Sequence, residues 1–192
     1  MMMMKVTAPW SLERESALRV SAEIKPSLIP NAGNGRFLNE AVKEGTVLMK
    51  SRIVSANDPD IFGHDVTIKM ESVEEMLTVM ERFKQHTEES EEVILSKFAD
   101  FLHSVPDVAH GRPRGTAWIL GASFHINHSV DSNVAFTFAS NRYFYVLATR
   151  DIAEGEEAYI NYEQLQVPDQ FAEYFLSRGT SSINVFVDSI RE

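Results

Sequence analysis

The chain has 192 residues, no cysteine and a formal net charge of −10. The lack of cysteine excludes disulfide bonds and cysteine-ligated zinc, and the acidic charge argues against a surface that grips nucleic-acid phosphates. No apolar run reaches the roughly 18 residues of a membrane span and no secretory leader is evident, so we expect one soluble intracellular domain, nuclear or cytoplasmic.

The first part of the chain reads as short strands and turns. One strand is expected at residues 17–24, before a turn at Gly33-Asn34-Gly35 whose glycines tolerate positive φ. Beyond this turn, β-forming residues at 36–38 and 46–49 flank a second turn at Glu44-Gly45. These features together predict a hairpin with a glycine-rich start.

A helical segment follows a strand expected at residues 65–70. Ser72 and Glu75 form a capping box at the start of the first helix, and a second helix is expected from about Glu89 to His103. The insert, about residues 71–104, holds nine acidic and three basic side chains, which indicates either a solvated face or attraction of a basic partner. The side chains expected in its core are Val73, Met76, Leu77, Met80, Phe83, Leu95, Phe98, Phe101 and Leu102.

The second half of the chain returns to strands and then ends in a helix. We expect strands at residues 133–138, 143–149 and 158–162. Pro168 suits the first helical position and Gly179 the position after a helix, so a helix is predicted between them. A last β-prone run lies at residues 183–187.

Two polar features stand out against apolar surroundings. Asn127-His128-Ser129 follows Ile126, and polar groups held there need partners, either in the protein or on a ligand. Tyr162 ends a short strand after Gly155-Glu156-Glu157. Taken alone, His128 fits a structural histidine and Tyr162 fits a strand tyrosine that packs one ring face. The six histidines are scattered, so no metal site is expected.

Three motifs in order carry a family resemblance. They are Gly33-Asn34-Gly35-Arg36-Phe37, then Ile126-Asn127-His128-Ser129 followed by Asn133, then Ala153-Glu154-Gly155-Glu156-Glu157 leading to Tyr162. Together they resemble the SET-domain protein lysine methyltransferases over about residues 18–178. The resemblance implies an α+β, mostly β fold of several small sheets with a pseudoknot, a helical insert and a C-terminal helix. It also implies a single SET domain over residues 1–192, with the insert at 71–104 and a closing segment at 165–192.

The resemblance further implies S-adenosylmethionine as cofactor, S-adenosylhomocysteine as product, and no metal. The glycine turn would meet the amino-acid part of the cofactor through its backbone, and Asn127 and His128 would hold the amino group and the adenine. Tyr162 is the implied catalytic residue, whose hydroxyl would orient the lysine amine and polarise the methyl group through weak oxygen contacts. The implied cofactor contacts are Gly33, Asn34, Gly35, Arg36, Phe37, Asn127, His128 and Tyr162.

The implied lysine channel would be lined by Tyr159, Ile160, Phe171 and Tyr174, with core packing as the alternative for Phe171 and Tyr174. Ile160 stands where many members carry the Tyr or Phe that tunes product multiplicity, so we expect methylation beyond the first step to be permitted. The substrate implied is a histone or another basic protein, with no direct nucleic-acid or membrane contact.

The sequence also departs from the family pattern. Val130 replaces the cysteine that commonly follows Asn-His-Ser, and the zinc-binding cysteine modules of many histone-directed members are absent. The channel would therefore be closed by residues 165–190 or by a partner. The Tyr-Ile-x-Tyr pattern most resembles the plant Rubisco methyltransferase branch. Two alternatives stay open: a catalytically silent module that binds a basic peptide or scaffolds a complex, and methylation of a residue other than lysine, such as histidine.

Overall fold

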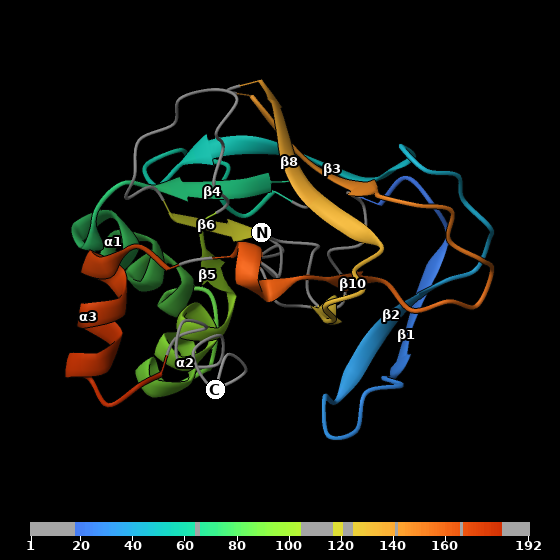
Figure 1. Cartoon of the computed structure of the whole chain (residues 1–192). Helices are drawn as coiled ribbons and strands as arrows, with labels where there is room; N and C mark the ends of the chain where they lie inside the picture. The colour runs from blue at the N-terminus through green and yellow to red at the C-terminus, as the bar shows by residue number, and fades with distance from the viewer. Residues whose placement is uncertain are drawn as a thin grey trace.

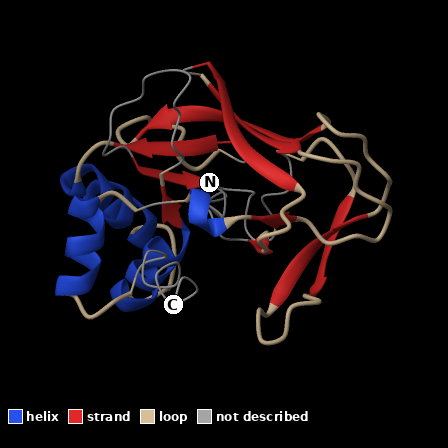
Figure 2. Cartoon of the chain, in the orientation of Figure 1, coloured by secondary structure: helices blue, strands red, loops and turns tan. Residues whose placement is uncertain are grey.

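The computed structural model describes residues 18–63, 66–104, 117–120, 125–140, 142–165 and 167–181. In this part of the chain, the strands form two two-stranded sheets and one six-stranded sheet. The three helices gather at one end of the large sheet, and the β1–β2 hairpin lies at the other end (Figures 1 and 2). The fold is mostly β, as predicted. The expected strand at 183–187 lies outside the described residues.

The first small sheet is the antiparallel hairpin of β1 (Ala22–Pro26) and β2 (Asn34–Leu38). The predicted hairpin between residues 36–38 and 46–49 is therefore wrong, because those segments lie in different sheets. The reason is that the second edge of β2 is taken by a distant segment: Leu38 N–H donates to the Glu156 carbonyl, and Ala158 N–H donates to the Arg36 carbonyl. The first strand also begins later than expected, at Ala22.

The six-stranded sheet has the order β5-β6-β4-β3-β9-β8, in which only the β3–β4 pair is parallel. The strands predicted from residues 65, 133 and 143 onward are present. In β9 the buried positions alternate, which is the pattern of a strand with one face on the core. The strands are β3 (Val47–Ser55), β4 (Val66–Met70), β5 (Leu102–His103), β6 (Ala117–Leu120), β8 (Val134–Ser140) and β9 (Tyr143–Ala148).

The helices are α1 (Val73–Lys84), α2 (Glu91–Phe101) and α3 (Asp169–Ser177). The predicted cap of α1 is confirmed, since Glu75 N–H donates to Ser72 Oγ at 3.2 Å. The expected burial of Leu77 is wrong: its side chain is 40% exposed, and Val79 faces the core instead. Helix α2 ends before the predicted His103, because Leu102 adopts extended backbone and pairs with Ile119 in β6.

Two clusters of buried side chains form the core. One cluster lies between the large sheet and the small sheets, and Tyr162 packs against it. The other lies between the large sheet and the three helices, and it includes Phe83, Phe98, Phe171 and Phe175. No helix in the described residues is long and apolar enough to span a membrane.

The second small sheet joins segments that are far apart in sequence. Strand β7 (Asn127–His128) pairs in parallel with β10 (Tyr159–Ile160). Just before β10, the same stretch of chain pairs with β2 through Glu156 and Ala158. Residues 155–160 thus lie between the glycine-turn hairpin and the Asn-His segment. The chain then enters a short 3₁₀ helix, η2 (Tyr162–Gln164).

Candidate functional site

The Asn127 side chain joins the glycine turn to β7. Its Nδ2 donates to the Asn34 carbonyl at 3.0 Å and to Glu157 Oε1 at 2.9 Å. The first bond crosses from β7 to the start of β2, so two of the three sequence motifs are in direct contact. Asn127 is half-buried, and Asn34 is exposed.

His128 joins β7 to the third motif. The Tyr162 N–H donates to His128 Nδ1 at 3.0 Å, and the two rings lie 5.3 Å apart between centroids. Burial lowers the pKa of His128, although the negative charge of Glu163 opposes this. An Nδ1 that accepts a hydrogen bond carries no proton, so the ring is a neutral imidazole protonated at Nε2.

Tyr162 is held by both its backbone and its hydroxyl. The hydroxyl donates to the Ile126 carbonyl at 3.0 Å, and the ring packs against the first core cluster. Burial raises the pKa of Tyr162 to about 12, and the charge of Asp100 acts in the same direction. The hydroxyl therefore stays protonated near neutral pH, so it can orient a substrate but cannot act as a tyrosinate base.

Glu157 is a fully buried carboxylate at the centre of these contacts, with 0% of the residue exposed. Its Oε1 accepts from Ser27 Oγ at 2.7 Å and from Asn127 Nδ2, and its Oε2 accepts from Leu28 N–H and the Tyr159 hydroxyl, both at 2.8 Å. Burial alone would raise the pKa of Glu157, but these four donors outweigh it and hold the pKa below its usual value.

Gly35 lies directly against this carboxylate. A Cβ at Gly35 would be 2.5 Å from the Glu157 carboxyl carbon and closer still to Oε1, whereas real Cβ atoms essentially never come within 3.0 Å of another atom. Gly33 is different, because it has φ +73° and open space where a Cβ would stand. Gly35 is thus needed for the close contact with Glu157, and Gly33 is needed for the left-handed backbone of the turn.

The last two residues of the glycine motif are covered by the rest of the protein. Arg36 and Phe37 are both buried, and the ammonium of Lys25 lies 4.3 Å from the Phe37 ring centroid. Of the five predicted cofactor contacts in this motif, only Gly33 and Asn34 are exposed.

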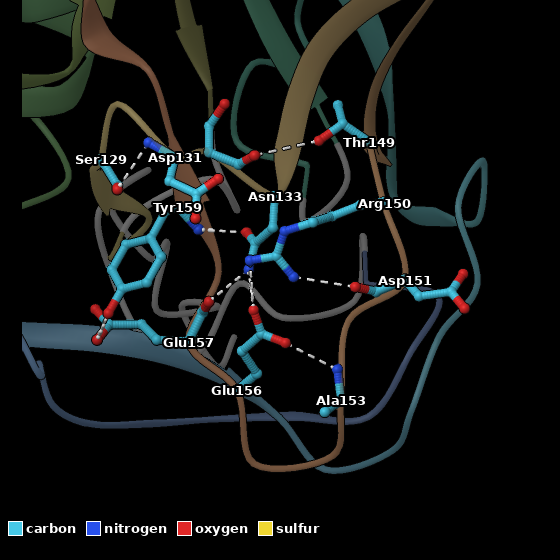
Figure 3. A network of polar contacts seen from close by, with 11 residues as sticks. Ser129, Asp131, Asn133, Thr149, Arg150, Asp151, Ala153, Glu156, Glu157 and Tyr159 are labelled. Atoms are coloured by element: carbon cyan, nitrogen blue, oxygen red, sulfur yellow. Dashed lines mark hydrogen bonds and ion pairs between the residues drawn. The ribbon is translucent and has the colours of Figure 1, made fainter.

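Asn133 fixes the path of the chain toward Tyr162. Its Oδ1 accepts from Tyr159 N–H at 2.7 Å, and its Nδ2 donates to the Glu157 carbonyl at 2.8 Å and to Glu156 Oε1 at 3.1 Å. Figure 3 shows this side chain in the middle of the network, between Arg150 and Tyr159. Because Asn133 is fully buried and bonded at both ends of its amide, its role is to hold the backbone.

The structure divides the four predicted channel residues between two places. Tyr159 and Ile160 pair with Asn127 and His128 across β10 and β7, beside the site. Phe171 and Tyr174 lie on α3, where they pack with α1 and α2 in the helical core cluster. These two α3 residues are therefore not brought together with Tyr162 in its cluster.

Sequence reasoning assigned no individual role to Glu157 or Ser27. The sequence does not single out Glu157, since it lies in the acidic run Glu154-Gly155-Glu156-Glu157 and most of its hydrogen-bond donors come from distant segments. Among the described residues, no group of three or more His, Cys, Asp and Glu side chains is placed to hold a metal ion.

The donor set around the turn suits a zwitterionic, cationic ligand. Gly33 and Asn34 are exposed, and a Cβ at Gly33 would meet no atom within 4 Å, so a ligand can approach this backbone closely. The half-buried side chains of Asn127 and His128 border the same turn, and the buried charge of Glu157 favours positive groups nearby.

Comparison with known proteins gave one family and a set of structures. The sequence model of the SET domain matches residues 33–163. A structure of the Chaetomium thermophilum Polycomb Repressive Complex 2 aligns with a TM-score of 0.52 at 16% identity, covering 82% of this chain and 17% of that chain. A humanized mutant of that complex, bound to an inhibitor, aligns with a TM-score of 0.50 at 18% identity, covering 86% and 17%.

These structural matches establish a likeness of fold. The chain spans about a sixth of the length of these two Polycomb chains, since it covers 17% of each. No curated protein sequence matches the chain significantly.

Proposed function

The chain belongs to the SET-domain family, and on this premise we propose that it is a protein lysine N-methyltransferase that uses S-adenosylmethionine. The observation that carries the proposal is the pair of bonds that unites three distant motifs. Asn127 donates to the Asn34 carbonyl, and Tyr162 N–H donates to His128 Nδ1. The residues expected to hold a methyl donor and the residue expected to orient the acceptor therefore form one connected unit.

The cofactor would be held by the turn and by β7. Backbone N–H groups of Gly33 and Asn34 would bind its carboxylate, Asn127 would bind its ammonium, and His128 would lie against its adenine. When bound, the cofactor supplies an electrophilic methyl group on a positively charged sulfur. Gly35, Arg36 and Phe37 support this wall from within, because their buried positions fix the course of β2.

Tyr162 would orient the acceptor amine. Its proton is committed to the Ile126 carbonyl, so toward an incoming amine its oxygen acts as a hydrogen-bond acceptor. A lysine amine has a pKa near 10.4 and must lose its proton before transfer, which a low-dielectric site beside a cationic cofactor favours. The buried neighbours Ile126 and Ile160 would exclude water from this place.

The substrate class follows from charge. A net charge of −10 would steer lysine-rich proteins, histones among them, toward the molecule. We propose that a single domain over residues 1–192 carries out the reaction. We also propose that residues 165–192 or a partner close the lysine channel. The described helix of that segment, α3, packs into the helical core.

Calorimetric titration with S-adenosylmethionine tests the proposal first. A catalytically silent module predicts no binding, whereas a methyltransferase predicts binding that His128→Ala weakens. The Tyr162→Phe variant should bind the cofactor as the wild type does and lose most turnover. Mass-spectrometric mapping of the product then separates lysine from histidine as the acceptor.

A further inference from the structure

We propose that Glu157 is a positioning residue whose hydrogen bonds, including one from the Tyr159 hydroxyl, hold the two walls of the methyl-donor pocket in a fixed relative position. We call this set of hydrogen bonds the lock. One wall is the glycine turn of the β1–β2 hairpin, and the other is Asn127 on β7. This inference rests on the proposed function for the identity of the pocket, and on the contacts below for the lock itself.

The carboxylate gathers donors from three separate segments. Ser27 and Leu28 come from the turn between β1 and β2, Asn127 comes from β7, and Tyr159 comes from β10. A buried charge is costly unless each oxygen is hydrogen-bonded, so these donors are strongly held in place. The three segments meet at this one group.

The glycine turn is tied to the same carboxylate. Ser27 Oγ donates to Glu157, and Ser27 N–H donates to the Gly33 carbonyl at 2.9 Å. Gly35 lies so close to the carboxylate that a Cβ there would overlap Glu157 Oε1, so the carboxylate would have to move to admit a side chain. The position of Gly33 relative to Asn127 therefore depends on Glu157 through contacts on both sides of the turn.

Tyr159 completes the shell around the charge. Its hydroxyl bonds to Glu157 Oε2, and its backbone pairs with Asn127 across the small sheet. Figure 3 shows the Tyr159 ring reaching back to the Glu157 carboxylate two residues earlier in the chain. Because its hydroxyl is hydrogen-bonded to Glu157, Tyr159 acts as a positioning residue for the methyl-donor pocket.

The adjacent Glu156 provides a matched control. Its carboxylate bonds to Asn133 Nδ2, Ala153 N–H and Arg150, and no contact joins it to the glycine turn or to Asn127 among the described residues. It is the same residue type, one position away, with a comparable number of partners. The Glu156 side chain is 28% exposed and Glu157 is fully buried, so Glu156→Gln controls for the loss of a carboxylate in this segment and not for the loss of a buried charge.

Glu157→Gln is a severe test because an amide cannot satisfy the same donors. If the new NH₂ group replaces Oε2, it faces the fixed N–H of Leu28; if it replaces Oε1, it faces the Asn127 Nδ2. We expect the dissociation constant for S-adenosylmethionine, measured by calorimetry, to rise by about tenfold or more, corresponding to one such bond. The turnover at saturating cofactor should stay within about threefold, because Tyr162 is not touched.

Milder variants keep the charge, in case Glu157→Gln does not fold. Ser27→Ala and Tyr159→Phe each remove one neutral hydroxyl donor, and each should weaken cofactor binding by about two- to fivefold. Glu156→Gln should leave cofactor affinity within about twofold of wild type. Wild-type affinity in both Ser27→Ala and Tyr159→Phe, or an equal loss in Glu156→Gln, would overturn the inference.

Hydrogen–deuterium exchange separates this inference from the proposed function, since it needs no cofactor. In Tyr159→Phe and Glu157→Gln, exchange should rise in residues 27–36 and 127–128 and stay unchanged in 150–155; Glu156→Gln should give the reverse. If the wild type binds no S-adenosylmethionine but shows this pattern, the proposed function fails and the lock stands. If the exchange pattern is absent, the lock fails whatever the wild type binds.

Discussion

Replacing Gly35 by alanine should destabilise the protein far more than a single methyl group in a strand suggests. The new Cβ would occupy the space of Glu157 Oε1, so the carboxylate must move. Its Oε1 accepts from Ser27 and Asn127, and both bonds are lost when it moves. Hydrogen bonds to a charged group contribute about 1.5–3 kcal/mol each, so we expect a loss of about 3–6 kcal/mol from a total of roughly 5–15 kcal/mol.

Urea unfolding followed by circular dichroism measures this loss, with Gly33→Ala as the matched control. At Gly33 a Cβ meets no atom within 4 Å, so only the left-handed backbone at φ +73° is strained, at a cost of about 1–2 kcal/mol. The Gly35 variant should therefore be the less stable of the two by about 1–5 kcal/mol. Equal unfolding free energies for the two variants would refute the assigned contact between Gly35 and Glu157.

Three further predictions follow from the same contacts. Tyr162→Phe removes the hydrogen bond to the Ile126 carbonyl and should lower the free energy of unfolding by about 1 kcal/mol, as measured by urea unfolding. In a methyltransfer assay the same variant should lose most of its turnover. His103 is buried, and burial lowers its pKa from 6.5 to about 4. The unfolded chain therefore takes up this proton at higher pH than the folded one, so stability should fall by up to about 3 kcal/mol between pH 7 and pH 4. Urea unfolding across this range should show a weaker pH dependence for His103→Phe, and an unchanged dependence would contradict the assignment. Ile160 carries no hydroxyl to anchor a water, so mass spectrometry of an optimised substrate should show di- or trimethyl product, and monomethyl product alone at long times would exclude this.

The sequence was sufficient for features that depend on neighbouring residues. The cap of α1 at Ser72 and the helix between Pro168 and Gly179 both form as predicted, because the residues that begin and end a helix lie within a turn of it. The strands β8 and β9 were also found, since their alternating pattern is local.

Features that depend on distant partners were not predictable in the same way. The pairing of β2 is decided by Glu156 and Ala158, which occupy its second edge, and this moves the hairpin partner from β3 to β1. A glutamate in a strand normally faces solvent, and Glu157 can be buried only because donors arrive from residues 27, 28, 127 and 159. The hydrophobic periodicity of the sequence does not predict those contacts, because most of the donors lie far from Glu157 along the chain.

The motif order predicted that Asn127, His128 and Tyr162 lie near the glycine turn, and the structure joins Asn127 to Asn34 and Tyr162 to His128. It did not separate the internal role of Gly35 from the exposed position of Gly33, because both are glycines in one short motif. It left Phe171 and Tyr174 open to the channel or to the core, and both pack in the helical core cluster. Helical amphipathicity predicts that a face is buried, but not against which element.

Labelled methyl transfer from S-adenosylmethionine to histones and to a cell lysate, followed by mapping of the labelled residue, is the most direct test of the proposed activity. The account predicts label on lysine side chains of basic proteins with the wild type, and almost none with Tyr162→Phe at equal cofactor occupancy. Label on another residue type, equal labelling by Tyr162→Phe, or no transfer by a wild type that binds the cofactor would contradict it.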